Sequence, residues 1–131
     1  MKKYLIIIVA FTLAVSVLSF PSCGGGDEQK FKECFEKWLD CSRKCEEMAK
    51  KVEEDYSNCL KQAKEKLKKA KEECDERFPD KGAAWADCLQ KAMDNANAEE
   101  TACAEARKQS MDAVEKCRKD CIEEFKKCAG W

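Results

Sequence analysis

The stretch Cys41-Ser-Arg-Lys-Cys45 carries two thiols four residues apart, and Cys117-Arg-Lys-Asp-Cys121 repeats this spacing near the other end of the chain. Thiols at this spacing serve as metal ligands, as redox-active groups or as structural cross-links. The spacing alone does not distinguish these three roles. The positions of the remaining cysteines do.

Ten cysteines between residues 34 and 128 form a mirror image. The gaps between neighbours are 7, 4, 14, 15, 14, 15, 14, 4 and 7 residues, a series that reads the same in both directions. The two residue numbers of each mirror pair add to 162, so the centre of symmetry lies near residue 81. This symmetry predicts five pairs: Cys34 with Cys128, Cys41 with Cys121, Cys45 with Cys117, Cys59 with Cys103, and Cys74 with Cys88.

The same gaps carry a helical period. Cys34 to Cys74 spans 40 residues, which is 11 turns at about 3.64 residues per turn. This value lies between the periods of left-handed and right-handed supercoils, so we expect one nearly straight stripe of thiols on each helix. The apolar residues on these stripes are Phe31, Trp38, Met48, Val52, Tyr56, Ala63, Leu67, Ala70, Trp85, Ala92, Ala96, Ala106 and Val114.

A helix break coincides with the centre of the mirror, at Phe78-Pro79-Asp80-Lys81-Gly82. Proline pushes the preceding residue out of helical space, and Asp80 is a candidate cap for the next helix. We therefore predict an all-α fold for residues 28–131: a long antiparallel two-helix hairpin, a nearly straight coiled-coil-like rod. Its helices cover about 28–77 and 81–128, its turn covers 78–81, and five interhelical disulfides form a ladder along it.

Distance also favours bonds across the hairpin. Residues four apart on one helix keep their Cβ atoms about 5 to 6 Å apart, whereas a disulfide needs about 3.5 to 4.5 Å. Cys41 and Cys45 should therefore bond across the seam. Small residues on the seam allow the backbones to come close: Ala63, Ala70, Ala92, Ala96, Ala102, Ala106 and Ser110.

Two CxxxC pairs joined first to fourth and second to third resemble the α-hairpinins, which are small helical hairpins stapled by disulfides. The resemblance rests on Cys41, Cys45, Cys117 and Cys121, and the loop between Cys45 and Cys117 is far longer than in that family. It implies a stapled hairpin, and the family's inhibitory and antimicrobial activities are not carried over.

The N-terminus has the pattern of an export signal, with Met1-Lys2-Lys3 followed by an apolar run to Phe20. The stretch Cys23-Gly24-Gly25-Gly26-Asp27 resembles the start of a mature bacterial lipoprotein, although Phe20 and Pro21 differ from that family's usual residues. The resemblance implies cleavage of a signal peptide at 1–22, a lipid (diacylglycerol and palmitate) on Cys23, and a tether at 23–27. An odd total of 11 cysteines agrees with one lipidated residue.

Two alternatives for this segment remain open. Ordinary secretory cleavage would leave Cys23 as an oxidisable thiol, and the predominantly apolar run of 17 residues from Tyr4 to Phe20 is just long enough for an uncleaved membrane anchor. With Gly24 after the lipidated cysteine, the lipoprotein resemblance implies sorting to the outer membrane of a Gram-negative cell, facing the periplasm or the cell surface.

Metal binding is the main alternative to disulfides. Thiols along helix faces resemble the bacterial four-helix copper-storage proteins, whose CxxxC pairs bind Cu(I). However, cysteine levels four turns apart lie about 21 to 22 Å apart, so most levels offer only two ligands. Zinc is less favoured, because the chain has no His and no CxxC pair. We therefore expect disulfides, an oxidising compartment, and no metal or cofactor apart from the lipid.

The charge pattern and the residue types exclude several functions. There are 25 Lys and Arg against 26 Asp and Glu, interleaved along the chain, so no basic surface for nucleic acid is predicted. His is absent, and no nucleophile has a base at motif spacing. We expect a non-enzymatic protein whose Glu and Lys pairs support solvated helices.

Aromatic residues gather at both ends of the predicted rod. One end should hold a cluster of Phe31, Phe35, Trp38, Phe125 and Trp131, interpreted as a hydrophobic plug or a membrane contact. At the other end Phe78 and Trp85 flank the turn, where they either pack the turn or contact a partner.

The leading hypothesis is a monomeric, lipid-anchored rod of the cell envelope that acts as a structural spacer or as a presentation module. The alternative is an envelope binding protein, for a protein partner or for Cu(I) through its thiols.

Overall fold

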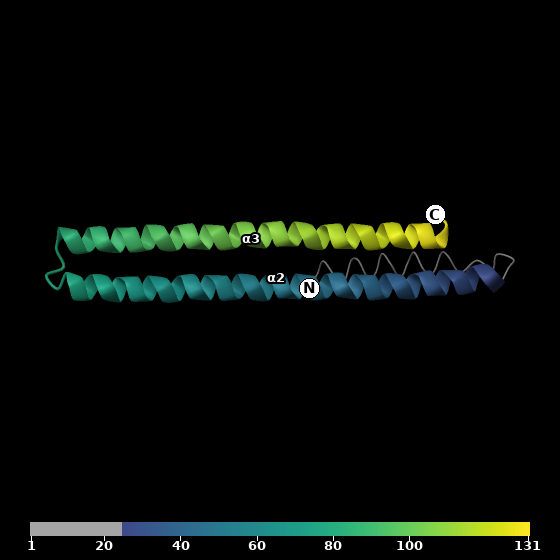
Figure 1. The fold of residues 1–131 in the computed structure, drawn as a ribbon, viewed down its shortest axis with the longest axis horizontal. Coiled ribbons are helices and arrows are strands. Elements are labelled where there is room, and N and C mark those ends of the chain that lie inside the picture. Colours follow the sequence, from purple (N-terminus) through teal and green to yellow (C-terminus); the bar gives the residue numbers. More distant parts are fainter. Residues whose placement is uncertain (1–24) are drawn as a thin grey trace, which may run out of the picture.

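Two long helices lie side by side in the computed structural model, which describes residues 25–131 (Figure 1). Helix α2 spans Gly25–Arg77 and helix α3 spans Ala83–Ala129. They run antiparallel without a marked bend, joined by a short turn at one end of the rod. At about 1.5 Å per residue, α2 is roughly 80 Å long and α3 roughly 70 Å. The predicted all-α hairpin is confirmed.

Charged residues complement the helix dipole at the N-terminus of α2 and at the C-terminus of α3. Asp27 and Glu28 lie in the first turn of α2, and Lys126 and Lys127 lie in the last turn of α3, where they complement the helix dipole. Gly130 ends α3 in the left-handed conformation with φ 78°, which glycine adopts without a steric penalty. The first turn of α3, by contrast, has no acidic residue.

The turn differs in detail from the sequence expectation. The amide of Lys81 donates to the carbonyl of Phe78 at 3.1 Å, and Lys81 itself has φ 50°. Because the chain reverses through this left-handed residue, α3 begins at Ala83, not at 81. Its N-cap is Gly82, with no side-chain hydrogen bond, so the expected capping role of Asp80 is wrong.

The core is one narrow seam of sulfur and small side chains. Its buried members are Cys34, Cys45, Ala63, Cys74, Ala92, Ala96, Cys103, Val114 and Cys121. No polar side chain is buried among the described residues. The core is therefore thin, and it follows the predicted stripe.

Two residues assigned to the stripe are exposed, as are Ala102 and Ser110 among the small residues expected on the seam. Met48 is 42% exposed and Ala106 is also exposed. Each follows a buried cysteine, Cys45 or Cys103, by three residues, which at 3.6 residues per turn places it about 60° away around the helix. The buried seam is therefore narrower than the apolar stripe.

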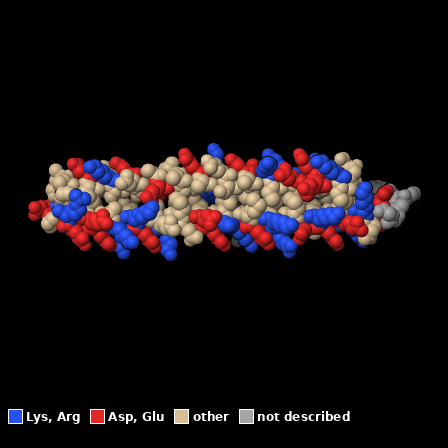
Figure 2. Space-filling view, viewed as in Figure 1, with Lys and Arg blue, Asp and Glu red and all other residues tan. Residues whose placement is uncertain are grey.

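Charges cover the rest of the rod. Figure 2 shows Lys and Arg interspersed with Asp and Glu along its visible face. Three ion pairs bridge the helices: Lys66 with Glu99 at 3.2 Å, Arg107 with Glu53 at 2.6 Å, and Arg118 with Glu46 at 2.8 Å. Within residues 25–131, neither helix contains a stretch apolar and long enough to cross a bilayer.

Candidate functional site

Five disulfides connect α2 to α3 and pair the cysteines as the mirror symmetry predicted. The bonds are Cys34–Cys128, Cys41–Cys121, Cys45–Cys117, Cys59–Cys103 and Cys74–Cys88. The Cα atoms of the pairs lie 5.6 to 5.9 Å apart, within the usual range for a disulfide. The helices therefore approach closely and evenly at all five levels.

The two CxxxC segments form a compact group of four sulfurs, here named the double rung: Cys41, Cys45, Cys117 and Cys121. The Sγ atoms of Cys45 and Cys121 belong to different disulfides, yet they are 3.5 Å apart. Neither sulfur carries a hydrogen in this state, so this is a van der Waals contact. The sulfurs of Cys45, Cys117 and Cys121 all lie within 4.8 Å of one another.

Burial separates the double rung from solvent. Cys45 is fully buried and Cys121 is 1% exposed, while Cys41 and Cys117 are half-buried. The segments between the cysteines carry Arg43 and Lys44 on α2, and Arg118 and Lys119 on α3. Two of the four cysteines are therefore shielded from water, and charged residues of both signs occupy the adjoining segments, including Asp120.

The predicted aromatic cluster is present at the end of the rod remote from the turn. Phe125 of α3 lies at its centre, with ring centroids 5.8 Å from Phe31, 6.4 Å from Trp38 and 5.6 Å from Trp131. Phe35 stacks on both Phe31 and Trp38. We call these five residues the base cluster. The amide of Trp131 donates to the carbonyl of Lys126 at 2.8 Å, which folds the chain end back onto Phe125.

At the turn, each aromatic ring contacts its own neighbours. The Nε1–H of Trp85 donates to Oδ1 of Asp75 at 2.7 Å, and the ammonium of Lys81 lies 5.6 Å from the Trp85 ring centroid. The guanidinium of Arg77 lies 5.3 Å from the centroid of Phe78. Both rings are half-buried. These contacts are those expected of turn packing, and partner recognition at this tip stays a prediction.

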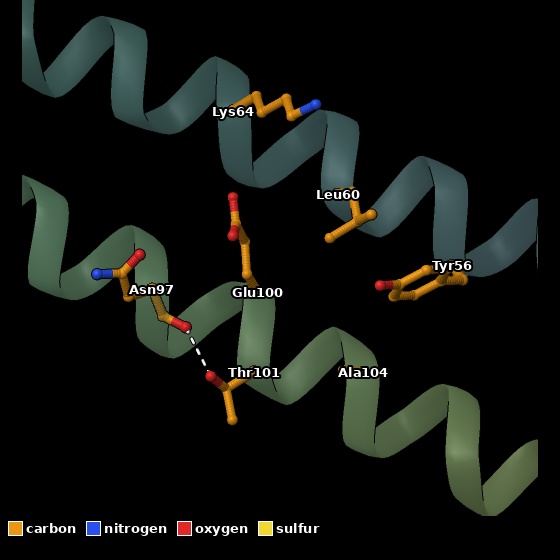
Figure 3. A pocket seen from close by; sticks show the side chains of 7 residues that line it. All are labelled: Tyr56, Leu60, Lys64, Asn97, Glu100, Thr101 and Ala104. Atoms are coloured by element: carbon orange, nitrogen blue, oxygen red, sulfur yellow. Dashed lines mark hydrogen bonds between the residues drawn. The ribbon is translucent and has the colours of Figure 1, made fainter.

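A lateral groove between the helices was not predicted. It has a volume of about 540 Å³ and is lined by Tyr56, Leu60, Lys64, Asn97, Glu100, Thr101 and Ala104. In Figure 3, Leu60 projects towards α3 and the Glu100 carboxylate towards α2, whereas the Thr101 hydroxyl donates to the backbone carbonyl of Asn97 at 2.9 Å. The sequence feature that could have indicated the groove is Ala104, whose small side chain lines it together with the larger Tyr56 and Leu60 of α2.

One charged group beside the groove has a shifted pKa. Arg107 donates two hydrogen bonds to Oε1 of Glu53, at 2.6 and 3.1 Å, and lies 5.2 Å from the centroid of the Tyr56 ring. The hydrogen bond to Glu53, followed by its negative charge, raises the pKa of Arg107 above its ordinary value. The guanidinium therefore stays charged and acts as an interhelical clamp, not as an acid or base.

The candidate lipidation residue, Cys23, and the predicted signal peptide at 1–22 lie outside the described residues. They stay predictions.

Comparison of the chain with protein-family models, with curated proteins and with solved structures gives no match.

Proposed function

We propose that this protein is a lipid-anchored rod of the bacterial cell envelope that acts as a non-enzymatic spacer or presents its tip to a partner. The observation that supports this function best is the disulfide ladder, five covalent links spread along both helices. A ladder of this kind maintains a fixed length. It offers little enclosed volume for catalysis.

The ladder solves the stability problem of an isolated hairpin. Two helices bury one narrow seam, which does not offset the conformational entropy of ordering about 100 residues. A disulfide that closes a loop of about 15 residues contributes roughly 3 kcal/mol in the chain-entropy model. Five such links keep the rod folded without a large core.

The proposed anchor determines which end of the rod lies near the membrane. Cys23 precedes the first residue of α2 by two positions, so a lipid on it would lie near the base cluster. The turn with Phe78 and Trp85 would then lie about 80 Å from the bilayer, the length of α2. Under this proposal residues 1–22 are removed, the mature chain carries acyl groups, and the oxidising side of the membrane matches the disulfides.

The absence of His from the sequence and the chemistry of the lateral groove support a non-enzymatic role. The groove is lined by an exposed Lys64, by Glu100 and by a Thr101 hydroxyl already bonded to its own helix. These groups do not combine a nucleophile with a base that activates it.

The anchor is tested by replacing Cys23 with Ala and separating membrane from soluble fractions. We expect the wild type to incorporate a labelled fatty acid and stay with membranes, and Cys23→Ala to lose the label and become soluble. Mass spectrometry should place the mature N-terminus at Cys23. A wild-type protein without the label would overturn the lipoprotein proposal.

The spacer role is tested by changing length. Deleting residues 46–59 and 103–116 removes 14 residues from each helix and shortens the rod by about 21 Å while the mirror register is kept. The matched control, Cys59→Ser with Cys103→Ser, loses the same two cysteines at full length. Energy transfer from a dye at the turn to the bilayer should increase only in the shortened chain, and equal transfer in both would contradict the spacer.

A further inference from the structure

We propose that the double rung becomes a zinc site of four thiolates when its two disulfides are reduced. In the oxidised rod Cys41, Cys45, Cys117 and Cys121 act as staples. Their sulfurs are already gathered at one level by two facing CxxxC segments, one on each helix. This inference does not depend on the lipid anchor or on the spacer role.

The sulfur positions suit a tetrahedral ion. Zinc binds thiolates at about 2.3 Å in tetrahedral geometry, which places neighbouring sulfurs about 3.8 Å apart, and a spacing of two to four residues between paired ligands is typical. The nonbonded sulfurs of Cys45 and Cys121 are 3.5 Å apart, close to that edge. Three of the sulfurs lie within 4.8 Å of one another, and the fourth, on Cys41, is bonded to one of them.

The bonded sulfurs of each disulfide are too close together for a tetrahedral site, and reduction of the two disulfides allows them to separate. When each disulfide is broken, its two sulfurs are no longer held at bonding distance, and they separate towards the tetrahedral edge by rotation of the cysteine side chains. The helix backbone keeps Cys41 and Cys45 on one face, and likewise Cys117 and Cys121. The site therefore requires no new fold.

Other levels of the ladder lack four sulfurs. Cys59–Cys103 is 14 residues from the double rung, about 21 Å along the rod. Cys34–Cys128 is seven residues away, about 10 Å, which is too far for its sulfurs to share an ion. The sequence interpretation disfavoured zinc because the chain has no His and no CxxC pair, and it disfavoured metal binding in general because most levels offer only two thiols. The double rung is the level at which two pairs face each other.

The charges near the double rung partly offset a negatively charged site. Four thiolates around Zn²⁺ carry a net charge of two minus. Four cations and one anion lie between the ligands in sequence: Arg43, Lys44, Arg118, Lys119 and Asp120. Arg43 also pairs with Asp40, and Arg118 with Glu46. Burial of Cys45 and Cys121 keeps water from two of the ligands.

The reaction is balanced with a dithiol reductant. Two dithiols deliver four electrons and four protons to the two disulfides, which become four thiols while each dithiol is oxidised to a disulfide. Zinc then replaces the four thiol protons, which are released to solvent. One zinc ion with four thiolate ligands therefore replaces the two disulfides as the link between the helices at this level.

The test uses the purified full chain, reduced by excess dithiol without oxygen and then freed of reductant. Cobalt(II) is added first, because tetrahedral Co²⁺ bound to thiolates has a characteristic visible spectrum. Zinc is added next, and its affinity is measured by competition with a chelator.

Two matched variants are compared. One replaces the double rung by Ser; the other replaces Cys34, Cys59, Cys103 and Cys128. Each variant keeps three of the five rungs, and its helicity when oxidised establishes that it folds.

We expect the wild type and the outer-rung variant to bind one zinc ion per chain in tetrahedral sulfur coordination, and the double-rung variant to bind none. If reduction unfolds the hairpin, zinc should restore helicity in the first two proteins and not in the third. Absence of the tetrahedral cobalt spectrum in the reduced wild type would overturn the proposal. Equal zinc binding by both variants would also overturn it, because it would show binding by any available thiols of an unfolded chain.

Discussion

The two halves of the rod are held together by different side chains. The base half contains three disulfides within 11 residues of α2, from Cys34 to Cys45, and the five rings of the base cluster. The outer half contains two disulfides, at Cys59 and Cys74, 15 residues apart. Between these levels the buried residues are alanines: Ala63, Ala92 and Ala96.

This difference separates two ways of joining helices. In the base half the rings add apolar area to the sulfur seam, so contacts and covalent links act together. In the outer half small side chains let the helices meet closely but bury little area, and the lateral groove opens beside Tyr56 and Ala104. Stability should therefore depend most strongly on disulfides where the core is smallest.

The largest expected effect is loss of the Cys59–Cys103 rung. The double variant Cys59→Ser with Cys103→Ser removes the disulfide that divides the stretch between Cys45 and Cys74. This stretch then has no cross-link along its whole length. In the chain-entropy model this costs about 3 to 4 kcal/mol of unfolding free energy. Guanidinium unfolding followed by circular dichroism measures the change.

The control for that comparison is Cys34→Ser with Cys128→Ser, which frees only the end of the rod next to the base cluster. It should cost less, because the neighbouring rung at Cys41 is close and the rings still hold the helices together. A larger loss of unfolding free energy for the Cys34 and Cys128 variant than for the Cys59 and Cys103 variant would contradict this comparison. It would show that the rings of the base cluster stabilise the base half little.

A second test crowds the outer seam. Ala96→Leu places a branched side chain where the helices approach through Ala96, and overpacking of this kind costs about 1 to 3 kcal/mol. Ala98→Leu, two residues on and exposed, is the matched control and should be nearly neutral. Chemical unfolding midpoints measure both. Equal midpoints would show that the outer seam has room for larger side chains.

A third test weakens the base half. Phe125→Ala removes ring contacts with Phe31, Trp38 and Trp131 and should cost about 1 to 2 kcal/mol, because the ring is half-buried. Ile122→Ala, at a site 45% exposed and one turn earlier, should cost less. Faster hydrogen exchange near residues 120–129 in the Phe125 variant alone would locate the effect at the base.

Much of this comparison was predictable from residue spacing. The mirror series of cysteines selects a single antiparallel register, and the helical period places every thiol on the seam, so the five bonds required no tertiary information. The base cluster followed from the same register. These inferences succeed because disulfides tolerate little error in distance.

The details that escaped prediction depend on local backbone geometry or on side-chain volume. Asp80 is a good capping residue by type, but the left-handed Lys81 moves the helix start to Ala83, beyond its reach. The lateral groove depends on which side chains lie opposite Ala104, and the double rung depends on the contact between two separate disulfides. Helical periodicity predicts which residues share one face of a helix, but it does not predict the volume left between neighbouring side chains.

The smallest expected effect is at Arg107, whose clamp on Glu53 spans the lightly packed stretch between the double rung and Cys59. Arg107→Lys keeps the charge but loses the paired hydrogen bonds and the planar contact with Tyr56, so the unfolding midpoint should fall by less than for Phe125→Ala. Arg118→Lys is the control, because Arg118 forms a similar pair with Glu46 beside the double rung, where two disulfides already join the helices. The folded pKa of Arg107 is raised, so its contribution is complete below the unfolded pKa and is lost only as strongly alkaline pH passes the folded pKa. The difference between wild type and Arg107→Lys should therefore stay constant from about pH 5 to about pH 9 and diminish at high salt. A larger effect at Arg118 than at Arg107 would contradict the view that single contacts matter more where disulfides are sparse.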